Sequence, residues 1–195
     1  MMKNIFVALF TFLMVVPMMA QKSEIIKDEV GSDGYRQICC NLINTRSFTD
    51  KYVFNIGLYA IEKDGNVQKF FVVDVTSNTP YKVENNMALL IKTKDDEVIK
   101  LTTEVGGDAS VRDIVKIANT YTHYYKTSCL YNISEEQIEK IKTGITKLRQ
   151  ETTTGYHEKE YTKAKDINKN SKIIIEQNNL INNALENHKT FESDF

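Results

Sequence analysis

The chain has 195 residues, of which 42% are hydrophobic, and its 25 basic side chains nearly balance 26 acidic ones. This composition suits one globular domain and excludes the collagen-like, fully disordered and long coiled-coil classes. The formal net charge of −1 supplies no basic stripe to neutralise phosphates, so we expect no nucleic-acid partner.

The first twenty residues have the order of features found in a secretory signal peptide. Lys3 supplies a positive charge, residues 5–16 are almost entirely apolar, and Pro17 and Ala20 precede a polar stretch. The apolar run is shorter than the roughly 20 residues that a membrane-spanning helix needs. We therefore expect residues 1–20 to be removed after Ala20. The product is expected to be exported, to the periplasm or the outside, with no membrane span after cleavage.

The residues that follow are predicted to form a flexible leader over 21–34 and then a β-rich domain over 35–162. Residues 52–61 carry apolar side chains on both faces, which predicts an interior strand. Asp64-Gly65 predicts a tight turn from this strand into a second one over residues 67–76, because glycine accepts the positive φ of such a turn.

Further β structure is predicted downstream of this hairpin. A second hairpin spans residues 87–103 around a charged tip. Residues 120–131 are dense in β-branched and aromatic side chains, which fit a pleated surface, and predict another strand. Residues 110–118 stay open between a short helix and a strand, because their apolar side chains also fit helical spacing.

Two helices are predicted in the last third of the chain. Ser134-Glu135-Glu136-Gln137 has the reciprocal pattern of a capping box and begins a short helix over residues 134–143. Gly144 is expected to end it in the left-handed conformation, with a strand over residues 145–151 to follow. Residues 163–190 contain neither Gly nor Pro and predict a long amphipathic helix.

One side of the predicted C-terminal helix is an apolar stripe. The stripe consists of Ile167, Ile174, Ile181 and Leu185. It could pack on the chain's own sheet, or it could mediate self-association with a second molecule. Strands followed by helices, without a βαβ rhythm, predict an α+β fold. In this fold a mainly antiparallel sheet, two-layered or sandwich-like, carries the short helix and the long helix packed on or beside it.

Residues 131–151 (YNISEEQIEKIKTGITKLRQE) and 87–103 (MALLIKTKDDEVIKLTT) resemble parts of small exported proteins of unknown function from gut Bacteroidetes. In that group a strand ending in tyrosine leads into a Ser/Thr-Glu-Glu-Gln helix, then Gly-Ile and a basic strand. The chain departs from this pattern at Asn132, where proline is expected, and at Gln150, where an apolar residue is commoner. The resemblance implies export and a fold, and it provides no catalytic residue.

The three cysteines allow two interpretations. Cys39 and Cys40 are adjacent, so on a strand they point to opposite faces and at most one of them can reach Cys129. Such a bridge would suit an exported protein. The alternative is three small buried hydrophobic residues. A redox role is disfavoured because the chain has no Cys-x-x-Cys pair.

Few side chains stand in a sequence pattern that indicates catalysis, metal binding or ligand binding. The three histidines are too scattered for a metal site, and neither a metal nor a cofactor is predicted. His157 and His188 are expected at the surface. Tyr121, His123 and Tyr125 share one face of the predicted strand, and we select them as candidate binding residues because tyrosine rings stack on sugars and peptides. The alternative is that they are ordinary residues of the sheet, since tyrosine at strand spacing is more often part of a core.

These observations favour a non-enzymatic exported protein, a binding or structural module of the bacterial cell envelope. Its partner would be an unidentified protein or glycan. The alternative is a small envelope hydrolase that uses unmarked carboxylates, or His123 in a cleft. The hydrolase would bring polar side chains from distant segments together in one pocket.

Overall fold

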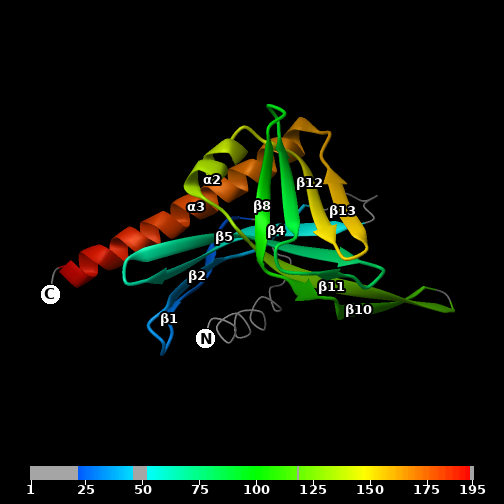
Figure 1. Cartoon of the computed structure of the whole chain (residues 1–195), viewed down its shortest axis with the longest axis horizontal. Helices are drawn as coiled ribbons and strands as arrows, with labels where there is room; N and C mark the ends of the chain where they lie inside the picture. The colour runs from blue at the N-terminus through cyan, green and yellow to red at the C-terminus, as the bar shows by residue number, and fades with distance from the viewer. Residues whose placement is uncertain (1–21, 46–51, 118, 194–195) are drawn as a thin grey trace.

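The computed structural model describes residues 22–45, 52–117 and 119–193, and shows a mainly antiparallel α+β fold (Figure 1). The predicted signal peptide, residues 1–20, lies outside these ranges. The elements, in chain order, are β1 (Ile25–Val30), β2 (Arg36–Cys40), β3 (Ile43–Asn44), β4 (Val53–Lys63), β5 (Asn66–Ser77), β6 (Lys82–Val83), β7 (Ala88–Thr93), β8 (Val98–Val105), β9 (Gly107–Asp108), β10 (Ser110–Ile117), β11 (Thr120–Asn132), α2 (Glu135–Ile141), β12 (Ile145–Thr152), β13 (Gly155–Glu160) and α3 (Ala164–Ser193).

Eleven of these strands form one sheet that turns sharply at its middle. The order is β1-β2-β4-β5-β11-β8-β7-β12-β13, with β3 beside β4 and β10 beside β11. At the turn, β11 and β8 share only the pairs Leu130–Val105 and Tyr131–Thr103, with a register irregularity between them. Figure 1 shows α2, α3 and the β8-β7-β12-β13 half on the same side of the long strands β4, β5 and β11.

The main core lies between the two halves of the sheet and the helices. It is built from the large side chains of both halves together with those of α2 and α3, among them Phe54, Phe71, Leu89, Tyr131, Ile138 and Ile174. A second, smaller buried cluster occupies the opposite face of the long strands and includes Tyr59, Phe70 and Leu130. Apolar residues on both faces of β4 thus make it an interior strand, as its sequence predicts.

The structure confirms the local predictions that rest on turn and cap chemistry. β4 and β5 pair along their whole length, and Asp64 and Gly65 join them with φ values of 51° and 77°. β7 and β8 form the second hairpin. The capping box is present, since the Ser134 hydroxyl accepts from the backbone of Gln137 and the Gln137 side chain accepts from the backbone of Ser134.

The apolar stripe of α3 packs on the chain's own sheet. Ile174, Ile181 and Leu185 belong to the main core, and Ile167 packs against it. Of the two uses predicted for the stripe, the structure therefore shows packing. Ile174, Ile181 and Leu185 are buried within the same molecule, and Ile167 is partly buried. None of the helices within the described ranges combines the length and the apolar character that crossing a membrane would require.

The prediction of a flexible leader is wrong for residues 25–30. They form β1, which pairs antiparallel with β2 from Ile25–Cys40 to Val30–Arg36. The buried guanidinium of Arg36 also binds the carboxylate of Asp28, at 2.8 Å for each of two nitrogens. β1 is an edge strand with three exposed residues at its end, so its own apolar pattern is weak and its partner determines it.

The side chain of Gln177 in α3 bridges a break in the sheet. β2 ends at Cys40 and β3 begins at Ile43, so the ladder along β4 is interrupted between them. Gln177 is fully buried there. Its amide nitrogen donates to the carbonyl of Asn41 at 2.7 Å, and its amide oxygen accepts from the backbone N–H of Leu58 at 2.8 Å. One side chain thus replaces two missing backbone partners.

A buried lysine ties β5 to both helices. Lys69 is 7% exposed, and its ammonium donates to Glu135 at the start of α2 and to the amide oxygens of Asn178 and Asn182 in α3. Asn178 also donates to the Glu135 carboxylate at 2.9 Å. Burial alone would raise the pKa of Glu135, but the hydrogen bonds from Lys69 and Asn178 outweigh it and hold that pKa below its usual range.

Candidate functional site

The candidate binding residues lie on a two-stranded arm. Of the open segment 110–118, Ser110–Ile117 forms a strand that pairs with β11, and residue 118 lies outside the described residues. β11 pairs with β5 only from Tyr125 onward, and β10 pairs with β11 alone. Residues 111–117 and 119–124, which we call the arm, therefore extend beyond the rest of the sheet, as Figure 1 shows.

The register of the arm brings six side chains to one face. Tyr121, His123 and Tyr125 alternate along β11 and share a face, as predicted. Their cross-strand partners on β10 are Lys116, Ile114 and Val111 respectively. We call these six residues the arm face. Sequence reasoning missed Val111 and Ile114 as members, because they lie three residues apart.

A β-bulge explains that spacing. The pairing shifts by one residue between Val111 and Asp113, which leaves Arg112 without an opposite partner in the ladder. Val111 and Ile114 consequently fall on the same face although their separation suits a helix. The guanidinium of Arg112 turns back to the sheet and donates to the Thr76 hydroxyl at 2.8 Å.

The arm face continues the core face of β11 into solvent. Tyr131 and Cys129 are fully buried in the main core, Tyr125 is half-buried, and His123 is exposed. Tyr121, nearest the tip, is 62% exposed. This face of β11 therefore carries side chains of the kinds found in the core along its whole length. The elements that cover the face end before the arm does.

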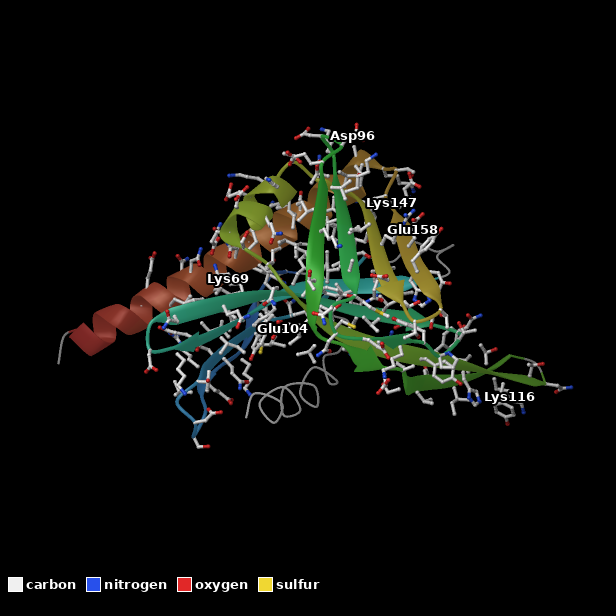
Figure 2. The ribbon with its side chains drawn as sticks, viewed as in Figure 1. Lys69, Asp96, Glu104, Lys116, Lys147 and Glu158 are labelled. Carbon is white, nitrogen blue, oxygen red and sulfur yellow. The ribbon has the colours of Figure 1, made fainter. Side chains whose placement is uncertain are left out.

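Exposed apolar side chains are concentrated on this face. Within the described ranges, seven large hydrophobic residues are exposed, and Val111, Ile114 and Tyr121 are three of them. The Lys116 ammonium lies 5.6 Å from the centre of the Tyr121 ring, and Figure 2 places Lys116 at the far end of the arm. The rings of His123 and Tyr125 lie 6.4 Å apart. The face is thus aromatic and aliphatic, with a cation at its tip.

The base of the arm is fixed by a buried ion pair. Lys126 of β11 places its ammonium 2.5 Å from the carboxylate of Asp74 in β5, which is 1% exposed. Burial raises the pKa of Asp74, and the charge of Lys126 opposes that rise. Together with the bond from Arg112 to Thr76, this pair fixes the direction in which the arm leaves the sheet.

The two histidines whose side chains are described, His123 and His157, lie in different parts of the fold. His123 is exposed on the arm rather than held in a cleft, and no group of three metal-ligating side chains occurs in the part of the chain that the structure describes. The prediction of a surface position is wrong for His157, which is 6% exposed. Its ring stacks on Tyr52 with 4.0 Å between ring centres and meets Tyr81 edge-on with 4.1 Å between ring centres. The side chain of His188 lies outside the described residues.

The three cysteines are buried and free, which matches the hydrophobic alternative. Cys39 and Cys40 face opposite sides of the sheet, as expected from their adjacency, and contribute to different apolar clusters. Burial raises the pKa of each of these two thiols to about 12 and also raises that of Cys129. Buried thiols with raised pKa values are poor nucleophiles.

The arm face is suited to binding. Its two phenols, imidazole, ammonium and two branched aliphatic groups offer apolar area with a few polar atoms. Exposed aromatic and aliphatic side chains of this kind mark macromolecular interaction sites. Comparison with protein-family models, curated proteins and solved structures finds no match to this chain.

Proposed function

We propose that the protein is a non-enzymatic binding module of the bacterial cell envelope and that its arm face docks a partner protein. The export part of this proposal rests on the signal-peptide pattern of residues 1–20. The binding part rests on one observation, the exposure of Val111, Ile114 and Tyr121 together on an arm of two strands.

The apolar content of the arm favours a protein as its partner. Fully burying a side chain such as Val, Ile or Tyr contributes about 1.5–3 kcal/mol, which the arm forgoes while it stands in solvent. A ribbon of two strands is also only marginally stable alone. A partner surface that covers the arm face would supply the missing layer of core, which explains why core-type side chains continue outward.

The free edge of β10 adds a second means of recognition. β10 pairs with β11 on one side, so the backbone groups of its other edge are open to an added strand. Lys116 at the tip favours an acidic group on the partner. We infer a partner that presents an apolar surface, an acidic side chain and an extended segment.

Photo-crosslinking from the arm tests this proposal. A photoreactive amino acid at Ile114, in the full chain expressed in cells, is expected to crosslink to a different protein, which is then purified. The double variant I114S/Y121S should bind that protein at least tenfold more weakly, since two apolar contacts are lost. V98S is the matched control, because Val98 is 60% exposed and lies on β8, away from the arm.

The outcomes separate the alternatives. Equal affinity of I114S/Y121S and V98S for the purified partner would contradict docking at the arm. Crosslinks only between copies of the chain would show self-association through the arm instead. The melting temperatures of both variants should match that of the unmodified protein, because substitutions at exposed sites change stability by roughly 0.5 kcal/mol or less.

A further inference from the structure

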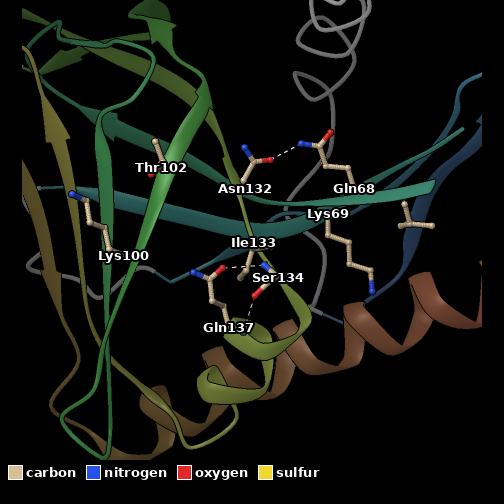
Figure 3. Close-up of a pocket in the computed structure, with 9 residues that line it drawn as sticks. Gln68, Lys69, Lys100, Thr102, Asn132, Ile133, Ser134 and Gln137 are labelled. Carbon is tan, nitrogen blue, oxygen red and sulfur yellow. Dashed lines mark hydrogen bonds between the residues drawn. The ribbon is translucent and has the colours of Figure 1, made fainter.

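A second surface, on the outer side of β8-β7-β12-β13, contains two adjoining hollows. The first has a volume of about 430 Å³ and lies between the start of β5, β8 and the start of α2 (Figure 3). The second has a volume of about 360 Å³ and is lined by β7, β8, β12 and β13. Lys100 lines both hollows, so they form one surface feature, which we call the groove.

The groove runs across the strands. Lys100 of β8 is opposite Leu90 of β7, which is opposite Arg149 of β12. Tyr156 of β13, which is opposite Glu151, lies diagonally from Arg149 and lines the same hollow. Three strand spacings of ~4.8 Å separate β8 from β13, and the first hollow lengthens the track beyond β8. The groove is therefore long and shallow, and its shape fits a short chain of rings rather than a single small molecule.

One end of the groove offers a fixed aromatic ring. Tyr156 is 58% exposed, and the Arg149 guanidinium lies 4.5 Å from the centre of its ring. Glu158 binds Arg149 at 2.6 Å and thereby orients the guanidinium. With one face of the ring covered by Arg149, the exposure of Tyr156 leaves the other face as a flat platform. Such a platform suits the C–H face of a sugar ring.

The other end is lined by hydroxyl and amide groups. Thr102, Gln68, Asn132, Ser134 and Gln137 surround the first hollow, as Figure 3 shows. Gln68 donates to Asn132 at 2.7 Å, and Asn132 donates to Glu104 at 2.7 Å, which holds both amides in place. Neutral donors and acceptors held by their neighbours are suited to hydroxyl groups of a ligand.

Lys100, in the middle of the groove, has no ion-pair partner among the described residues. Among the basic residues of this face, Lys92 pairs with Asp96, and Lys147 and Arg149 pair with Glu158. Lys100 is exposed, and none of the described carboxylates lies within ion-pair distance of it. Glu151, the carboxylate that lines the second hollow, instead accepts from the backbone N–H of Ala88 at 2.9 Å.

We propose that the groove binds a short oligosaccharide that carries a carboxylate, with the sugar ring on Tyr156 and the carboxylate on Lys100. An acidic peptide is disfavoured by the direction of the groove. A peptide gains affinity by adding to the edge of a sheet, whereas this groove runs across the faces of the paired strands β8, β7, β12 and β13.

Titration of the purified chain, without residues 1–20, tests this proposal. The probes are hexagalacturonate, a neutral N-acetylglucosamine oligomer of equal length, and a polyglutamate peptide. Hexagalacturonate should bind most tightly, and its affinity should fall with added salt. Y156A should weaken its binding at least tenfold, and K100Q should abolish the preference for the acidic over the neutral oligomer. K92Q, which alters a paired lysine outside the groove, should change neither property.

Three results would overturn the proposal. They are no binding of either oligosaccharide, equal binding of polyglutamate, and binding of hexagalacturonate that survives Y156A. The arm variant I114S/Y121S should bind hexagalacturonate normally, because the arm contributes no residue to either hollow. Failure of the groove proposal and failure of the arm proposal are therefore separable.

Discussion

Lys126 and Asp74 join the arm to the body of the sheet through a pair whose carboxylate is 1% exposed and lies 2.5 Å from the ammonium. Lys126 lies where the pairing of β11 with β5 ends on the side of the arm, and it is adjacent to Tyr125, the innermost residue of the arm face on β11. The buried ion pair thereby fixes the orientation of the arm face relative to the sheet.

Removing one member of this pair should destabilise the protein strongly. K126M leaves the Asp74 carboxylate buried without its counter-charge, and breaking such a pair costs about 3–5 kcal/mol. The double variant D74N/K126M should lose less than the sum of the two single losses, because it leaves no unpaired charge. Urea unfolding of the four proteins measures this coupling. Additivity to within about 0.5 kcal/mol would contradict a direct interaction.

Acid should weaken the contact between α2 and α3. Because the pKa of Glu135 is lowered in the folded state, the unfolded chain binds a proton at this site more readily than the folded chain does. Its contribution to stability is thus present above the ordinary glutamate pKa of about 4.3 and is lost as the pH falls through the lower folded value. E135Q should flatten the decrease in unfolding free energy over this range.

The matched control for that experiment is E139Q. Glu139 lies on the same helix and pairs only with the exposed Lys142 at 3.5 Å. Unfolding by urea at a series of acidic pH values should give a curve for E139Q that parallels the unmodified protein. If E135Q and E139Q gave the same slope, the network of Lys69, Asn178 and Glu135 would not be responsible.

The thiols should resist alkylation in the folded protein. The thiolate is the reactive form, and burial raises the pKa values of Cys39 and Cys40 to about 12. Iodoacetamide should therefore modify the native protein very slowly, even at about pH 9, where an ordinary thiol with a pKa of about 8.5 is mostly ionised. In urea all three cysteines should react. Fast native labelling that rises with pH would contradict their burial.

The features that sequence analysis predicts correctly are those encoded by neighbouring residues. Asp64-Gly65 adopts positive φ at both positions, which few other pairs allow, and the Ser134 cap needs only residues within one helical turn. The alternation of Tyr121, His123 and Tyr125 is equally local. In each case the physical cause lies within four residues of its effect.

The features that it misses depend on partners far along the chain. The bulge at Arg112 gives Val111 and Ile114 a helical spacing on a strand, so the arm face cannot be read from periodicity. His157 is buried because Tyr52 stacks on it and Tyr81 packs edge-on against it, both from distant segments. Gln177 belongs to a polar stretch of the last helix, yet the break between β2 and β3 draws it fully inside.

The bridge made by Gln177 has a consequence for biosynthesis. The carbonyl of Asn41 and the N–H of Leu58 obtain these partners only when residue 177, near the end of the chain, has been made. Any pairing of β2 and β3 with β4 before that point therefore has to form without this bridge.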